Sequence, residues 1–360
     1  MRSGDLQLFT IGETLFEDLF TEIKNATHHV HILFYIVKND RFCHEFLSLL
    51  KEKAKQGVEV RLLIDRIGGK HISRQAIESL EKVGVQFHFC HIPKFPYLFY
   101  SFNARNHRKI SVIDGKIGYI GGFNIGKEYL GNDPKLGFWR DYHIKVTLEG
   151  VWDLQKQFLF DWADASNEHL YNDSTYFPSL PSGHIKMKIV PTDGAYLQGV
   201  FLNLIEQAEK EIMIGTPYFI PGDKIMKALI DAAKRGVTIK IMTPRASDHP
   251  FVKHASYPYF KILIQYGIEL YHYEKGFYHA KVIVIDEKIC DVGTANFDKR
   301  SLYINHEINC LIYDRDFITD VKMQLRKDLA SATLLTHDDL NRNFLDRSKE
   351  SISTLISHFL

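Results

Sequence analysis

The chain of 360 residues lacks any apolar run near the ~20 residues that a membrane-spanning helix requires. Its longest strand-like apolar run, from Val30 to Val37, is far too short. The opening MRSGDLQLF also lacks the apolar core of a secretory signal. We therefore expect membrane contact to be peripheral, or to depend on an N-terminal segment that this sequence does not contain.

Cysteine is scarce and scattered. The four cysteines show no CxxC spacing, which predicts reduced core thiols and neither a disulfide framework nor a zinc site. The 18 histidines include no HExxH or comparable metal-ligand spacing, so we expect no metal and no cofactor.

An excess of charge of one sign is also missing. Lys+Arg 45 against Asp+Glu 44 leaves a formal net charge of +1. Proteins that bind nucleic acid usually show a strong basic excess, so no nucleic-acid partner is expected. The composition, 45% hydrophobic and 25% charged, is typical of a globular protein.

The chain does contain an internal repeat. NHRKISVIDGKIGYIGGFN at 106–124 and YHAKVIVIDEKICDVGTAN at 278–296 align without a gap. The alignment places His107, Lys109, Asp114, Gly121 and Asn124 on His279, Lys281, Asp286, Gly293 and Asn296.

The repeat extends beyond these two motifs. Each half begins with a short β-branched run, continues with an amphipathic helix that ends in basic residues and a glycine (Gly57 or Gly236), and returns to β-branched runs. This alternation predicts an α/β fold, with two tandem α/β/α repeats that form a pseudo-twofold dimer with mixed sheets. The expected boundaries are 1–165 for the first repeat, 166–184 for a linker rich in Ser, Asn, Pro and Gly, and 185–360 for the second repeat.

The first half carries eleven extra residues before its motif, because 23 positions separate Gly84 from His107 but only 12 separate Gly267 from His279. Aromatic residues with basic neighbours suit a membrane interface or a lipid-tail groove. The alternative is that they pack into the seam of the pseudo-dimer. The apolar residues of this insertion are Phe95, Tyr97, Leu98, Phe99, Tyr100 and Phe102.

The motifs have the chemistry needed to cleave a phosphodiester. In a strand, residues two apart project from one face, so each half presents one imidazole and one ammonium group together, His107 with Lys109 and His279 with Lys281. One neutral histidine can attack phosphorus, while the other, protonated, gives a proton to the departing alkoxide. Lysines and asparagine amides can stabilise the charge on the phosphate oxygens.

The pattern HxKx4Dx6GxxN, present twice, resembles the HKD motif of the phospholipase D superfamily. GFWRDYHIKVTLEGVWDLQKQFLFDW and TPYFIPGDKIMKALIDAAKRGVTIKIMTP are similar to segments of bacterial cardiolipin synthases, and the similarity runs through nearly the whole chain. The resemblance implies a catalytic set of His107, Lys109, Asp114, His279, Lys281 and Asp286. The two aspartates begin turns, however, and we expect them to brace structure and not to touch substrate.

The resemblance implies further site residues. Lys109, Asn124, Lys281 and Asn296 are expected to bind phosphate. Glu307 and Asp141 are expected to orient the histidines, since a carboxylate on one ring nitrogen fixes the tautomer. By the same resemblance, His107 is the nucleophile and His279 the acid and base.

One departure from the family pattern is visible. Relatives commonly carry Gly-Ser or Gly-Thr at the end of the motif, as in Gly293-Thr294, but the first copy has Gly121-Gly122. We expect the missing hydroxyl at Gly122 to cost one minor hydrogen bond.

The resemblance implies phosphatidyl transfer between two phosphatidylglycerol molecules, which gives cardiolipin and glycerol, at the cytoplasmic face of the cell membrane. The residues alone leave the acceptor open, because water or another alcohol would use the same covalent intermediate. A nuclease-like phosphodiesterase and a non-catalytic lipid-binding scaffold are the alternatives. The tail SKESISTLISHFL has helical spacing, which favours a packed terminal helix over membrane contact. No oligomeric state is predicted.

Overall fold

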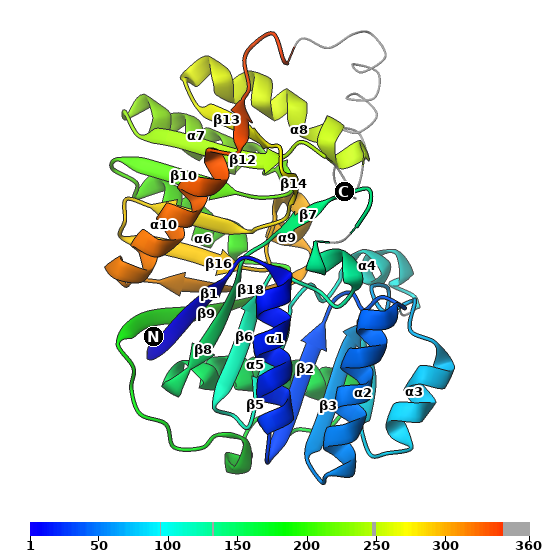
Figure 1. Cartoon of the computed structure of the whole chain (residues 1–360). Coiled ribbons are helices and arrows are strands. Elements are labelled where there is room, and N and C mark those ends of the chain that lie inside the picture. Colours follow the sequence, from blue (N-terminus) through cyan, green and yellow to red (C-terminus); the bar gives the residue numbers. More distant parts are fainter. Residues whose placement is uncertain (94, 132, 247–249, 341–360) are drawn as a thin grey trace.

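One mixed sheet of fifteen strands runs through the whole molecule in the computed structural model (Figure 1). The structure describes residues 1–93, 95–131, 133–246 and 250–340. The tail for which a terminal helix was predicted lies outside these residues.

The first half contributes seven neighbouring strands to the sheet, in the order β1-β8-β6-β5-β2-β3-β4. Its strands are β1 (Arg2–Phe9), β2 (His29–Phe34), β3 (Glu59–Asp65), β4 (Gln86–Cys90), β5 (Ile110–Ile113), β6 (Ile117–Gly121), β7 (Phe138–Arg140) and β8 (His143–Thr147). Its helices are α1 (Gly12–Asn25), α2 (Arg41–Lys55), α3 (Arg74–Glu81), α4 (Leu98–Asn103) and α5 (Val151–Ser166).

The second half repeats this order as β9-β18-β16-β15-β10-β12-β13, with β19 added at the edge. Its strands are β9 (Ile185–Asp193), β10 (Glu211–Gly215), β11 (Phe219–Ile220), β12 (Thr238–Pro244), β13 (Glu269–Tyr273), β14 (Gly276–Tyr278), β15 (Val282–Ile285), β16 (Ile289–Gly293), β17 (Phe297–Asp298), β18 (His306–Ile312) and β19 (Ala332–Leu334). Its helices are α6 (Leu197–Glu206), α7 (Asp223–Lys234), α8 (Pro250–Leu263), α9 (Lys299–Tyr303) and α10 (Arg315–Leu329).

The two halves join along the equivalent strands β1 and β9. These strands pair antiparallel, with Arg2 opposite Met187 and Gly4 opposite Ile185. The predicted α/β repeats are thus present, but their sheets are continuous and not separate. Helix α5 ends at Ser166 and strand β9 begins at Ile185, while the boundaries of the two repeats as domains stay a prediction.

Helices cover both faces of the sheet. Successive side chains of a strand point to opposite faces, and those of the central strands are therefore buried on both sides. In β2, Leu33 packs in the cluster beneath α5, while Ile32 packs in the cluster beneath α1 and α2. In β15, Val284 and Ile283 divide in the same way between the shared cluster and that of the second half. The shared cluster contains residues of both halves, so one core supports the seam.

The glycines predicted to end two helices and the predicted buried thiols are confirmed. Gly57 and Gly236 follow helices α2 and α7 with φ of 88° and 92°, the left-handed conformation that a glycine after a helix adopts without strain. All four cysteines are buried and unpaired. In the part of the chain that the structure describes, no helix has both the length and the apolar character needed to cross a bilayer.

Candidate active site

Each motif reaches across the seam and pairs with a strand of the other repeat. The backbone N–H of His107 donates to the His306 carbonyl at 2.9 Å, at the start of β18. In the equivalent place, the N–H of His279 donates to the Arg140 carbonyl at 2.7 Å, where β14 runs parallel to β7. These contacts bring both motifs to the interface between the repeats.

The crossing places each histidine beside the carboxylate of the opposite repeat. Nδ1 of His107 lies 2.9 Å from Oε2 of Glu307, and Nδ1 of His279 lies 2.5 Å from Oδ2 of Asp141. Both carboxylates are fully buried. The structure therefore brings together the residues expected to orient the histidines, in crossed pairs. With Nδ1 engaged, Nε2 is the ring nitrogen available for chemistry.

The two lysines are buried in the same place. Nζ of Lys109 donates to the His107 carbonyl at 2.7 Å. Nζ of Lys281 donates to the His279 carbonyl and lies 2.9 Å from the Nδ1 atom of that histidine. Each ammonium group is thereby held beside the imidazole of its own motif.

Burial and neighbouring charge set the protonation states. Burial lowers the pKa of His107 to about 4, against the opposing effect of Glu307, so the imidazole is neutral at neutral pH. Burial also lowers the pKa of Lys109 to about 7, with Lys281 adding to the effect and Glu307 opposing it. Burial opposes ionisation of Glu307 and Asp141. The hydrogen bond from the facing imidazole and the nearby lysine nevertheless hold the pKa of each carboxyl below its usual range.

Two hydroxyl groups fix the Glu307 carboxylate. Oγ1 of Thr294 donates to Oε2 at 2.6 Å, and Oγ of Ser301 donates to Oε1 at 2.7 Å. Sequence reasoning missed Ser301, which lies outside the motif in the short helix α9. The only sequence signal is that Ser301 lies six positions before the carboxylate.

Gly122, the departure from the family pattern, provides space for the other carboxylate. A Cβ at Gly122 would lie 2.0 Å from Oδ1 of Asp141. The Asp141 carboxylate accepts instead from the backbone N–H of Tyr142 at 2.8 Å, with the Trp139 indole N–H 3.5 Å away. The absence of a side chain at position 122 is therefore also a steric requirement, which our expectation of one lost minor hydrogen bond did not include.

The motif aspartates lie outside this site. The carboxylate of Asp114 accepts from the backbone N–H groups of Thr27, His28 and His29 at 2.8–2.9 Å. That of Asp286 accepts in the same way from the backbone N–H groups of residues 209–211. Each aspartate follows a strand that its histidine precedes, which puts them about 20 Å apart along the chain. The aspartates brace the start of β2 and β10, as we expected from their place in turns. The catalytic role that the family resemblance implies for them stays a prediction, which these contacts do not support.

The motif asparagines Asn124 and Asn296 are buried, and each lies 17 positions after the histidine of its motif. Oδ1 of Asn124 accepts from the Ile36 N–H at 3.0 Å, which leaves its amide NH2 as the donor for a ligand. The backbone N–H of Asn296 donates to Ser301 Oγ at 3.1 Å, and its Oδ1 has no hydrogen-bond partner among the described residues. Their binding of phosphate stays a prediction.

Aromatic rings pack on both imidazoles. Tyr35 lies 4.9 Å from His107, and Trp139 lies 4.9 Å from His279, measured between ring centroids. Neither ring was among the predicted site residues. Within the described ranges, no group of three or more His, Cys, Asp or Glu side chains is arranged to hold a metal ion.

Comparison with known proteins assigns the chain that contains these crossed motifs to a family. The family model described as "Cardiolipin synthase, PLD-like domain" matches residues 19–137 and 201–329, one match in each repeat. The chain belongs to this family. The predicted resemblance and the predicted phospholipase D-like fold are therefore confirmed.

Curated cardiolipin synthases are similar over the whole chain. Minor cardiolipin synthase ClsB of Bacillus subtilis (strain 168) is 42% identical over 100% of this chain and 90% of its own length. Cardiolipin synthase of Oceanobacillus iheyensis is 38% identical over 100% of this chain and 76% of its own length. Among solved structures, phosphatidylserine synthase of Haemophilus influenzae Rd KW20 covers 100% of this chain with a TM-score of 0.78 at 15% identity, a likeness of fold.

Proposed function

We propose that the chain is a phosphatidyltransferase that joins two phosphatidylglycerol molecules into cardiolipin and releases glycerol. The observation that carries this proposal is the buried interface site, in which two histidines each meet a lysine of their own motif and a carboxylate of the other repeat. Membership of the cardiolipin synthase family supports the transferase over a hydrolase that uses the same intermediate.

In the first step, Nε2 of His107 attacks phosphorus of the donor lipid. The bond from phosphorus to the glycerol oxygen breaks, and His279, protonated, gives its proton to that oxygen so that glycerol leaves. The neutral state of His107 suits it as the nucleophile. Lys109, Lys281 and the amides of Asn124 and Asn296 stabilise the phosphate oxygens.

In the second step, a terminal hydroxyl of the second phosphatidylglycerol attacks the phosphohistidine. His279 takes the hydroxyl proton, the phosphorus–nitrogen bond breaks, and cardiolipin forms with both histidines restored. Glu307 and Asp141 hold the two rings in the required tautomer throughout.

We also propose that the aromatic insertion contacts the membrane. Its six large apolar side chains, at positions 95, 97–100 and 102, are between 52% and 89% exposed around helix α4. This exposure contradicts the alternative that they pack into the seam. Clustered apolar side chains at a surface mark an interaction site, and aromatic rings suit the lipid headgroup region. Peripheral contact at the cytoplasmic face would bring the site to its substrate.

The test is to incubate the chain with phosphatidylglycerol in mixed micelles without added metal and to resolve the lipid products and glycerol. Cardiolipin and glycerol in equal amounts are expected, and His107→Ala and His279→Ala should each stop the reaction. Phosphatidic acid would show that water is the acceptor. No turnover of phosphatidylglycerol would overturn the proposal, and nucleic acid would then be tested.

A further inference from the structure

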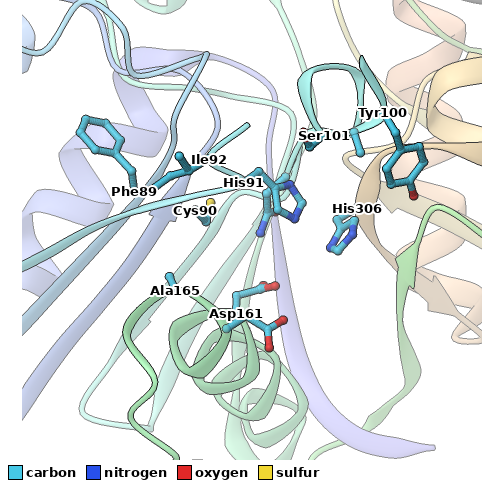
Figure 2. A pocket seen from close by; sticks show the side chains of 12 residues that line it. Phe89, Cys90, His91, Ile92, Tyr100, Ser101, Asp161, Ala165 and His306 are labelled. Carbon is cyan, nitrogen blue, oxygen red and sulfur yellow. The ribbon is translucent and has the colours of Figure 1, made fainter. Parts of the chain in front are cut away.

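A cavity of about 420 Å³ lies among β4, helix α4, helix α5 and the start of β18, and Figure 2 shows the side chains that line it. Asn106 and His306 pair in a parallel β-bridge and line this cavity. Their neighbours His107 and Glu307 belong to the catalytic site. Because successive residues of extended chain point to opposite sides, the bridge separates the cavity from the reacting groups.

One wall of the cavity presents a buried acceptor. Asp161 on helix α5 is 5% exposed, and its Oδ1 lies 2.5 Å from Nη1 of Arg108. Its Oδ2 is buried without a hydrogen-bond partner among the described residues. Burial raises the pKa of Asp161 to about 6, against the effects of Arg108 and the Gln157 amide, so the group is an anion at neutral pH. A buried acceptor of this kind favours a ligand that brings a donor.

Two imidazoles form the facing wall. The rings of His91 and His306 pack edge to face, with centroids 4.2 Å apart, and Figure 2 shows them above Asp161. Nδ1 of His91 also lacks a hydrogen-bond partner in the described chain. Burial lowers the pKa of His91 to about 3 and that of His306 to about 4, so both rings are neutral at neutral pH.

This lining selects the chemistry of the ligand. Two carboxylates, Asp161 and Asp164, line the cavity and disfavour a phosphate anion, which binds best to cationic groups. Hydroxyl groups, in contrast, can donate to Oδ2 of Asp161 and to Nδ1 of His91. The Phe89 and Tyr100 side chains add apolar surface for a carbon backbone. A small polyol satisfies both requirements.

We propose that this cavity binds a glycerol moiety, either as the headgroup of phosphatidylglycerol or as free glycerol. The proposal rests on the proposed function, because that reaction consumes phosphatidylglycerol and releases glycerol. Tyr100 both lines the cavity and belongs to the exposed aromatic insertion. A headgroup could therefore enter from a bilayer that the insertion contacts, while its phosphate stays at the mouth. The bound glycerol does not react, since the bridge keeps it from His107.

The test uses the full chain with ¹⁵N-labelled histidine and the substitution His279→Ala, which prevents turnover. The imidazole signals of His91 and His306, assigned with His91→Gln and His306→Gln, are followed by NMR. Three probes are titrated: free glycerol, dihexanoyl phosphatidylglycerol and, as the control headgroup, dihexanoyl phosphatidylcholine. We expect the first two to shift both signals and the third to leave them in place. A shift with the lipid alone assigns the site to headgroups, and a shift with glycerol alone assigns it to the product.

A cavity-filling variant provides the second arm. Ala165→Leu on α5 places a larger side chain in the cavity and should weaken glycerol or lipid binding by at least about tenfold. Ala54→Leu makes the same change on helix α2, away from the cavity, and should bind like the parent. The proposal is overturned if neither glycerol nor dihexanoyl phosphatidylglycerol shifts the imidazole signals. It is also overturned if the Ala165→Leu variant binds these probes as well as the Ala54→Leu variant does while both remain folded. Failure of the proposed function would instead appear as unmodified chain that makes no cardiolipin.

Discussion

Gly122 and Asp141 are packed so closely that a single methyl group on the glycine would overlap the carboxylate, at 2.0 Å from Oδ1. In the other repeat the equivalent position is Thr294, whose hydroxyl donates to Glu307 at 2.6 Å. The two repeats thus hold their carboxylates by different means: the shorter acid lies against a glycine, and the longer acid is bound by hydroxyl groups.

This difference predicts the effect of restoring the common family residue. Gly122→Ser should displace Asp141 and with it His279, and lower kcat by about a hundredfold or more, because overpacking of a buried position costs about 1–3 kcal/mol and moves side chains. Cardiolipin formation in micelles measures kcat. Thr294→Ser, which keeps the hydroxyl, is the matched control and should remain near the parent rate. A Gly122→Ser enzyme with full activity would contradict the steric interpretation.

The crossed pairs predict which variants behave alike. A phosphatidyl ester of p-nitrophenol needs no proton for its leaving group, so loss of the general acid should not slow release of nitrophenol. His279→Ala and Asp141→Asn should both keep the rapid first release of nitrophenol, the burst that accompanies formation of the phosphohistidine. His107→Ala should abolish it, and Glu307→Gln should slow it by about 10²–10⁴-fold, as for a misoriented triad histidine.

Stopped-flow absorbance of nitrophenolate measures the burst. If His279 is the nucleophile and His107 the acid, the variants that keep the burst and those that lose it are exchanged. Each carboxylate variant should still behave like the variant of the histidine in the opposite repeat. Grouping within a repeat, with Asp141→Asn resembling His107→Ala, would refute the crossed arrangement.

The pH profile is predicted by Lys109 and His107. The Lys109 ammonium group, whose pKa is lowered to about 7 by burial, loses its charge as the pH rises through that value, so kcat/KM should fall on the alkaline side. On the acid side, His107 stays neutral until the pH approaches 4, and the rate should persist below the usual histidine range. Lys109→Arg keeps the charge and should remove the part of the alkaline fall that Lys109 causes, even if its rate is lower. The part that arises because His279 loses the proton it must give to the leaving group should remain. A profile that is flat from pH 6 to 9 would count against this role of Lys109.

Buried histidines predict loss of stability in acid. Nε2 of His29 lies 3.1 Å from Oε1 of Gln155, and Nε2 of Gln155 lies 2.9 Å from Nδ1 of His31. Burial lowers the pKa of His29 to about 4 and that of His31 to about 3. The unfolded chain takes up protons below pH ~6.5 while the folded chain does not, so the free energy of unfolding falls from that pH down to the folded values.

The contribution of His29 alone is about 3 kcal/mol between pH 6.5 and 4. Urea titrations at a series of pH values measure the slope. His29→Asn should flatten it, whereas His44→Gln, at an exposed position, should not change it. An unfolding free energy that is the same at pH 7 and pH 4.5 would show that these side chains are not buried in neutral form.

The exposed insertion predicts membrane affinity. Replacing Phe99 and Phe102 together with Ser should weaken binding to phosphatidylglycerol vesicles by at least about tenfold, since each ring contributes roughly 1.5–3 kcal/mol when fully buried. Flotation on a density gradient measures the bound fraction. Met323→Ser removes an exposed apolar side chain from helix α10 and should bind like the parent. Equal flotation of all three proteins would exclude the insertion as the contact.

The sequence was sufficient to predict the repeats, the α/β layers and the histidine and lysine of each motif, because these depend on local periodicity and on aligned spacing. It did not predict the crossed pairs, since His107 and Glu307 are 200 positions apart and meet through backbone contacts between the two repeats, such as that of the His107 N–H with the His306 carbonyl. The role of Gly122 was also missed, because an absent side chain shows its purpose only beside its neighbour.

Because each catalytic pair contains one residue from each repeat, the two repeats cannot be separated without loss of the site. Cutting between the repeats would separate each imidazole from the acid that orients it, so neither fragment would hold a complete catalytic pair. The glycine that makes room for Asp141 lies in one repeat, yet the histidine that depends on it lies in the other. Each repeat therefore supplies the carboxylate that orients the histidine of the other repeat, and a substitution in one repeat can impair the histidine of the other.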